Sequence, residues 1–225
     1  MRLRADFGER AAVTPDQYDW VPSPAPGVER MMLDRVGDEL ARATSIVRYA
    51  PGSRFPAHEH GGGEEILVLD GEFGDEHGVY PAGYYLRNPP GTRHSPRIGS
   101  DGATIFVKLH QFATDDAAQL ATDTGRGGWT PGRIDGVEIQ ALHRHRGENV
   151  FLMRWAPDTA CPEHAHVGGE EILVLDGAVH DEDGHYPKGS WVRYPDGSRH
   201  APYTLAEGAL LFVKEGHLPS GDLPQ

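Results

Sequence analysis

Short apolar runs bounded by turn residues recur along the chain. Ile66 to Leu69 and Leu210 to Val213 are continuous apolar runs, whose length is typical of strands and too short for a stable helix. Pro-Gly, Asp-Gly and Pro-Ala-Gly sequences, which favour tight turns, lie between such runs. The pattern predicts an all-β protein with antiparallel connections, and its expected strands include 43–49, 64–69, 84–87 and 103–109.

The expected strand around Ile66 is apolar on both faces, so both faces should be buried. One helix is predicted, from Thr114 to Ala121, because Asp115 and Asp116 precede an alanine- and leucine-rich stretch and acidic residues stabilise a helix N-terminus. The polar, glycine-containing segment from Thr122 to Gly128 then has the composition of a linker.

The chain contains two copies of one sequence unit. Gly62 to Gly71 reads GGEEILVLDG, and the same ten residues recur from Gly168 to Gly177, 106 positions later. Without a gap, this offset also pairs residues 106–108, Phe-Val-Lys, with residues 212–214. Upstream of the copies the offset becomes 109, which pairs Trp20 with Trp129. A repeat of this size predicts two domains, residues 1–117 and 118–225.

Composition excludes several partners and locations. A formal charge of −13 without a Lys/Arg cluster disfavours direct binding to nucleic acid or to an anionic membrane. The segment after Met1 lacks the apolar stretch of a signal peptide, and no run of about 18 apolar residues occurs, so we expect a cytoplasmic protein. Cys161 is the single cysteine, which rules out an internal disulfide and a multi-cysteine zinc site.

Histidines and a glutamate recur at matched positions in both copies. Side chains two residues apart on a strand share a face, so His58 and His60 should converge on one point. Glu64 follows a glycine turn, and His94 follows a Pro-Pro-Gly turn. A lone histidine is more often a solvated side chain, but the same quartet recurs 106 residues later. We therefore predict one divalent metal ion per domain, with the ligands His58, His60, Glu64 and His94 in the first copy and His164, His166, Glu170 and His200 in the second.

Other polar residues near the quartets are interpreted as structural. Glu65 and Glu171 alternate to the opposite strand face from the ligand glutamates. Cys161 corresponds to Phe55 in the other copy, which favours a packing role. We interpret Arg87 and Arg193 as members of structural ion pairs. We interpret Tyr80 and Tyr186 as packed side chains with hydrogen-bonded hydroxyl groups.

Two spaced motifs resemble those of the cupin superfamily. The first is Gly52-x5-His58-x-His60-x3-Glu64-x6-Gly71, and the second is Gly83-x5-Pro89-x-Gly91-x2-His94. The second copy repeats both, with Asp158 in place of the opening glycine, and the asparagine that usually ends the second motif is replaced by Ile98 and Thr204. More narrowly, both copies resemble the cupin-like domain of the anti-sigma factor ChrR. The resemblance implies two tandem cupin domains (double-stranded β-helix, jelly roll), with the eight residues above as ligands of Zn²⁺, or alternatively of Fe, Mn or Ni ions.

Two functions are compatible with these observations. The first is a sensor or regulatory metal-binding protein of the ChrR cupin-like family, in which four protein ligands close the zinc site. The alternative is a metal-dependent dioxygenase or related cupin enzyme, in which the metal binds a small molecule and Glu64 or Glu170 ligates or acts as a base. Residues 1–19 are short and contain no cysteine, so we expect no sigma-binding domain there. A small-molecule ligand is the expected partner, and a homodimer remains an open alternative.

Overall fold

The computed structural model describes residues 1–38 and 40–221. Within these ranges the chain forms strands and two short 3-10 helices, β1 to β21, η1 and η2, and no α-helix. The predicted all-β class is therefore confirmed. Neither of the helices in the described part of the chain is long and apolar enough to span a membrane.

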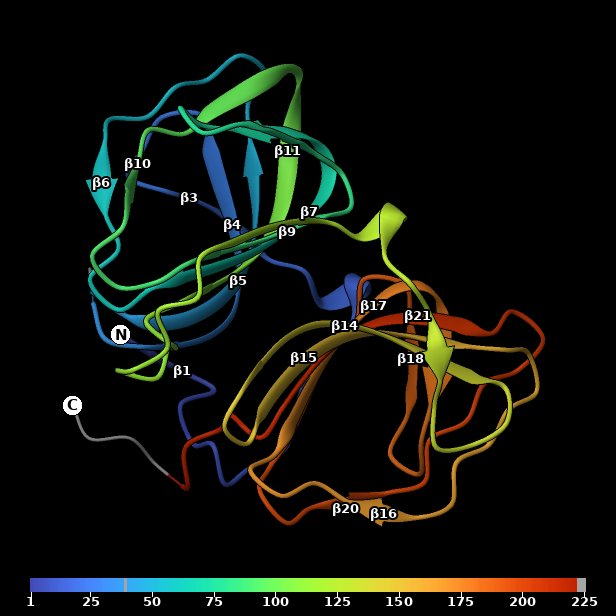
Figure 1. Cartoon of the computed structure of the whole chain (residues 1–225). Helices are drawn as coiled ribbons and strands as arrows, with labels where there is room; N and C mark the ends of the chain where they lie inside the picture. Colours follow the sequence, from blue (N-terminus) through green and yellow to red (C-terminus); the bar gives the residue numbers. More distant parts are fainter. Residues whose placement is uncertain (39, 222–225) are drawn as a thin grey trace. The chain divides into compact units, whose positions relative to one another are not determined.

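The described residues form two compact units that do not follow the chain in simple order. Residues 1–5 and 19–126 belong to the first unit, and residues 6–18 and 127–221 belong to the second. The boundary predicted at 117/118 describes the sequence repeat and stays a prediction, whereas the contacts divide the chain after Arg126. Figure 1 shows the strands of both units.

The first unit contains one large sheet in the order β1-β4-β5-β11-β7-β9-β12, with β3 paired to β4 and β8 to β7, and a separate pair β10-β6. Figure 1 shows the β6–β10 pair apart from β4, β5 and β11. The elements are β1 (Arg2–Leu3), β3 (Trp20–Pro22), β4 (Val28–Val36), β5 (Arg42–Tyr49), β6 (His58–Glu59), β7 (Glu64–Gly74), β8 (Val79–Pro81), β9 (Tyr84–Asn88), β10 (Arg93–His94), β11 (Arg97–Leu109), β12 (Leu120–Asp123) and η2 (Thr124–Arg126).

The second unit repeats this plan. Its large sheet has the order β13-β14-β15-β21-β17-β19-β2, with β18 paired to β17 and a separate pair β16-β20. The elements are β2 (Ala11–Val13), η1 (Pro15–Gln17), β13 (Thr130–Pro131), β14 (Val137–His145), β15 (Glu148–Trp155), β16 (His164–Ala165), β17 (Glu170–His180), β18 (His185–Pro187), β19 (Trp191–Tyr194), β20 (Arg199–His200) and β21 (Ala209–Glu215).

Each unit receives one edge strand from the segment that precedes the other copy. Strand β12, which leads into the second copy, pairs with β9 of the first unit. Strand β2, which leads into the first copy, pairs with β19 of the second unit. The registers match, because Leu120 lies opposite Arg87 and Ala11 lies opposite Arg193. The copies have therefore exchanged equivalent strands, which extends each sheet with residues from outside its own repeat.

The predicted helix from Thr114 to Ala121 is wrong. Residues 114 and 115 form a turn, residues 116–119 have no regular secondary structure, and β12 begins at Leu120. The Asp116 carboxylate is buried, lies 2.5 Å from the Arg87 guanidinium, and accepts a hydrogen bond from the backbone N–H of Ala118 at 3.1 Å. This ion pair and local turn, together with the free edge of β9, override the weak helical preference of the alanines.

A glutamate is the first inward-facing residue of β7 and of β17. Ile66 and Val68 on β7 belong to the apolar core of the first unit, and Glu64 lies on the same strand face because residues alternate. Ile172 and Val174 take the same places in the core of the second unit, with Glu170 at the start of β17. An otherwise apolar row thus begins with a buried carboxyl group in each unit.

Two turn positions explain parts of the repeated motifs. Gly71 and Gly177 have φ of 69° and 65°, and a Cβ on either would lie 2.1 Å from a carbonyl oxygen, that of Gly102 or Gly208. Asp158, which replaces the motif's opening glycine, has φ of 53° and so adopts the left-handed conformation of Gly52 (φ 67°). Aspartate is one of the few non-glycine residues that enter this region readily, so the fold tolerates the replacement.

Replacing Gly177 with alanine should destabilise the protein. The left-handed conformation alone costs an L-residue about 1–2 kcal/mol, and the overlap with the Gly208 carbonyl adds to this. We expect a lower urea midpoint for G177A, measured by tryptophan fluorescence. G128A is the matched control, because a Cβ at Gly128 would meet no atom within 4 Å; equal midpoints for the two variants would contradict the explanation.

Candidate metal centres

The short strand pairs bring two histidines of each quartet face to face. His58 on β6 lies directly opposite His94 on β10. Beyond β6 the pairing continues through backbone hydrogen bonds between His60 and the loop of Gly91 and Thr92, both 3.0 Å long. Backbone pairing therefore holds His58, His60 and His94 together. Glu64 comes from β7 of the large sheet.

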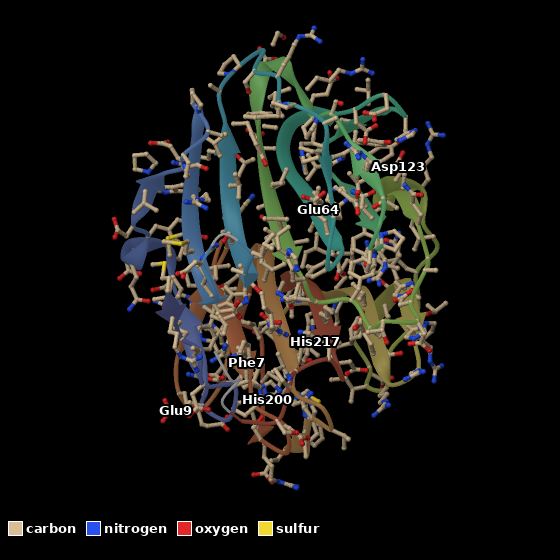
Figure 2. The ribbon with its side chains drawn as sticks, turned by 90° about the vertical axis from the view of Figure 1, so that its left-hand side faces the viewer. Phe7, Glu9, Glu64, Asp123, His200 and His217 are labelled. Atoms are coloured by element: carbon tan, nitrogen blue, oxygen red, sulfur yellow. The ribbon has the colours of Figure 1, made fainter. Side chains whose placement is uncertain are left out.

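The four predicted residues of the first copy lie together. One ligand atom from each of His58, His60, Glu64 and His94 lies within 4.8 Å of the others. The Glu64 carboxylate is 3.3 Å from Nε2 of His60 and 3.5 Å from Nε2 of His94. The carboxylate and two of the imidazoles are buried, whereas His58 is exposed. Figure 2 labels Glu64 on its strand.

The outer nitrogens of these rings are occupied, which turns the inner nitrogens toward the site. Nδ1 of His58 lies 3.2 Å from the Pro56 carbonyl oxygen, and Nδ1 of His60 lies 3.0 Å from the Thr92 hydroxyl oxygen. The Thr92 hydroxyl donates to the Pro89 carbonyl, so its oxygen accepts from His60. Nδ1 of His94 lies 3.3 Å from a carboxylate oxygen of Asp75.

The inner nitrogens fit a metal ion. Nε2 of His60 and Nε2 of His94 are buried, and within residues 1–38 and 40–221 neither has a hydrogen-bond partner. Leaving buried polar atoms unpaired is costly. A divalent cation would satisfy both nitrogens and the carboxylate at once, and three imidazoles with one carboxylate are a ligand set of first-row divalent ions.

The second copy gathers its histidines in the same way. His164 and His200 lie opposite each other on β16 and β20, and the ligand nitrogens of His164, His166 and His200 lie within 4.8 Å of one another. Nε2 of His166 and Nε2 of His200 are 2.9 Å apart. The pairing geometry of the first copy is thus reproduced.

Glu170 lies slightly farther from its two nearest imidazoles than Glu64 does from the corresponding ones. Its carboxylate is 3.5 Å from Nε2 of His166 and 3.8 Å from Nε2 of His200, and it also groups with Glu215. His164 is not part of that group. The structure therefore brings all four residues of the first copy into one group, whereas in the second copy the three histidines form one group and Glu170 forms another with His166 and Glu215. Metal binding by all eight stays a prediction.

Burial controls the protonation of these groups. It raises the pKa of Glu64 to about 7 and, with the nearby Glu215 carboxylate, that of Glu170 to about 8. It also lowers the pKa of His60 to about 4 and that of His166 to about 3, with neighbouring imidazoles adding to the effect. Near neutral pH these imidazoles are neutral and can donate lone pairs to a metal.

Residues outside the quartets complete the sites. Asp75 and Asp181 lie behind the last histidine of each copy, and Asn88 donates a hydrogen bond to Glu64 at 3.2 Å. The sequence analysis did not select them, although Asp75 and Asp181 are related by the repeat offset. The repeat could not have pointed to Glu215, because the equivalent residue of the first copy is Leu109.

The residues interpreted as structural have structural partners. Arg87 pairs with Asp116, and Arg193 donates to backbone carbonyls of the N-terminal segment. Glu171 accepts from Trp191 at 3.0 Å. Sulfur of Cys161 lies 3.5 Å from Nδ1 of His164 and also packs against the core of the second unit.

The family model of the ChrR cupin-like domain matches residues 8–113 and again residues 117–219. The chain belongs to the ChrR cupin-like family. Each match covers one repeat, so this chain is a tandem pair of cupin domains, as the motifs implied. No curated protein matches it in sequence.

Solved structures confirm the cupin fold of this family member. A proposed dioxygenase from Nostoc punctiforme is 20% identical over 100% of this chain and 84% of its own, with a TM-score of 0.75. The protein Ylba from E. coli is 16% identical over 99% and 97% of the two chains, with a TM-score of 0.70. A variant of oxalate decarboxylase from Bacillus subtilis is 12% identical over 95% and 78%, with a TM-score of 0.65. At these identities the similarity shows the fold alone.

Removing one histidine from each site tests the ligands. We expect His58→Ala and His164→Ala each to lower the bound metal by about one ion per chain, because each removes a donor from one site. Elemental analysis after dialysis measures the content. His77→Ala removes an exposed histidine outside the clusters and should have no effect; full metal content in both ligand variants would contradict the assignment.

Metal binding should release protons from the buried glutamates. At about pH 6 the carboxyl groups of Glu64 and Glu170, with pKa values of about 7 and about 8, are protonated in the metal-free protein. A bound cation needs the carboxylate, so it should displace about one proton per site, and the release should vanish near pH 9.5, where both are already ionised. Calorimetry in buffers of different ionisation enthalpy measures this. The double variant E64Q/E170Q should show no such pH-dependent release.

Proposed function

We propose that this chain is a metal-dependent cupin enzyme of the dioxygenase type that acts on a small oxygen-rich molecule. His58, His60, Glu64 and His94 would hold the divalent ion in the first domain, and the second quartet would hold another. The ion would polarise a bound carbonyl or carboxylate and activate dioxygen at coordination positions that the protein leaves open.

The observation that carries the proposal is the chemistry and exposure of the ligand set. Structural zinc sites are mostly rich in cysteine, whereas histidine and carboxylate sets are typical of catalytic sites. Among the described residues, the candidate groups formed by the predicted ligands contain imidazole and carboxylate donors. His58 forms an exposed side of the first site, so a small molecule can approach from there, while Glu64, His60 and His94 are buried.

The protein's own residues hold this arrangement in place. Thr92 and Asp75 fix the rings of His60 and His94 through their Nδ1 atoms, and Asn88 orients the Glu64 carboxylate. Such outer contacts set the tautomer and basicity of ligating histidines. They favour a preformed site that needs little rearrangement when the ion binds.

Names of structural relatives are consistent with an enzyme. The Nostoc protein carries a proposed dioxygenase assignment. Bacillus subtilis oxalate decarboxylase has Mn(II) centres, and the enzyme from Lactobacillus farciminis was solved with formate. Manganese or iron with a small carboxylate or dicarbonyl compound is thus a reasonable first combination to test, and zinc is the alternative that the sequence favoured.

A regulatory role is the second candidate, because the matching family model describes the ChrR cupin-like domain. In that case zinc would complete a four-ligand site and stabilise each domain without turnover. A cytoplasmic location, a homodimer, a small-molecule ligand and the lack of nucleic-acid or membrane partners also stay predictions from the sequence.

Dioxygen uptake tests the proposal. Metal-free protein reconstituted with Fe(II), Mn(II), Ni(II) or Zn(II) would be assayed for oxygen consumption with a 1,3-dicarbonyl compound, and for carbon dioxide release with oxalate. We expect turnover with at least one of the first three ions and loss of turnover in the double variant H60A/H166A. Tightly bound zinc with no turnover under any condition would favour the regulatory candidate and overturn the enzyme.

A further inference from the structure

An aspartate behind the last histidine holds the same position in both domains. Asp75 and Asp181 are related by the repeat offset. In each, Oδ1 accepts hydrogen bonds from two backbone N–H groups of the following turn and from a tyrosine hydroxyl, Tyr80 at 3.3 Å or Tyr186 at 3.0 Å. The two carboxylates are therefore anchored alike through one oxygen.

The second oxygen is used differently. In the first domain Oδ2 of Asp75 lies 3.3 Å from Nδ1 of His94. In the second domain Oδ2 of Asp181 accepts from the Tyr194 hydroxyl at 2.6 Å and from the Arg10 guanidinium at 3.2 Å. Nδ1 of His200 is buried and, across the described part of the chain, has no hydrogen-bond partner.

Two sequence differences account for this divergence. Tyr194 stands where the first domain has Asn88, which instead donates to the Glu64 carboxylate. Arg10 lies one residue before the exchanged strand β2, and the equivalent residue before β12 is the neutral Gln119. The guanidinium of Arg10 also lies 5.3 Å from the centre of the Tyr194 ring, so the two residues act on Asp181 together.

Tyr194 also changes the surroundings of the histidines. Its ring centre is 4.2 Å from that of His200 and 6.2 Å from that of His166, with which it is stacked. The ring fills space beside both imidazoles, and its hydroxyl is committed to Asp181. The second site thus has an apolar ring near His200 and a carboxylate whose charge is shared with Arg10.

A carboxylate that accepts the outer N–H of a ligating imidazole fixes its tautomer and raises its basicity, and loss of such a partner typically lowers metal affinity about 10- to 100-fold. We propose that the two metal sites are not equivalent: the first binds a divalent ion about 10- to 100-fold more tightly, with Asp75 as its positioning residue, whereas Arg10 and Tyr194 withhold Asp181 from His200 in the second. This inference rests on the metal assignment that underlies the proposed function.

Single-site proteins make the comparison direct. H164A/H166A leaves only the first site, and H58A/H60A leaves only the second. Each would be titrated with Co²⁺ against a competing chelator, with the visible absorption of bound Co²⁺ as the signal. We expect affinity about 10- to 100-fold higher for the first site. Asp75→Asn should lower the affinity of the first site by a similar factor, whereas Asp181→Asn should change the second site little.

The exchange of two residues provides the decisive variant. In the second-site protein, R10Q/Y194N installs the residues of the first domain, releases Asp181 toward His200, and should raise Co²⁺ affinity and alter the absorption spectrum. R10Q alone removes one of the two contacts to Oδ2 of Asp181 without changing a buried side chain, so it should raise the affinity less than the double variant. K188Q is the control, because it removes an exposed positive charge of the second unit that pairs with Asp176. It should leave affinity unchanged.

The outcomes separate this inference from the proposed function. Equal Co²⁺ affinities at the two sites, or no gain of affinity in R10Q/Y194N and R10Q, would overturn the inequivalence while leaving the enzyme proposal standing. Absence of Co²⁺ binding in both single-site proteins would overturn the ligand assignment, and with it both proposals.

Discussion

The arrangement of this protein depends on a buried carboxylate placed against neutral imidazoles. Removing a carboxyl group from water is unfavourable unless it stays protonated or meets a cation. Burial raises the pKa values of Glu64 and Glu170. Among the described residues, the buried Nε2 atoms of His60 and His94 have no hydrogen-bond partner. A divalent ion would satisfy both groups with one interaction, which would account for polar side chains at the end of an otherwise apolar core row.

Strand pairing supplies the geometry for that interaction. The small β6–β10 and β16–β20 pairs hold two histidines of each domain opposite each other, and the first inward residue of β7 or β17 brings the carboxylate from the facing sheet. The exchange of β2 also connects the N-terminal segment to the second site, because Arg10, next to β2, donates a hydrogen bond to Asp181. A segment that precedes the first copy thus takes part in the site of the second.

The two domains serve as internal references for each other. Shared features, such as the anchored aspartate and the left-handed turn positions, identify what the fold needs. Differences around the same scaffold, above all Asn88 against Tyr194 and Gln119 against Arg10, identify where the sites have diverged. The same candidate ligands recur in both domains, and the proposed difference in metal affinity rests on the changed surroundings.

The sequence by itself determined the repeat, the all-β class and the clustering of the three repeated histidines in each copy, because strand alternation and turn residues act locally and the repeat offset made each candidate histidine visible twice. Tertiary structure decided the rest. The segment from Thr114 to Ala121 is not helical, because its last two residues pair with β9 and Asp116 forms an ion pair with the buried Arg87. The partner of Asp181 depended on Arg10, which is 171 residues away in the chain. Such contacts have no local periodicity, since they arise only when strands from different repeats pair.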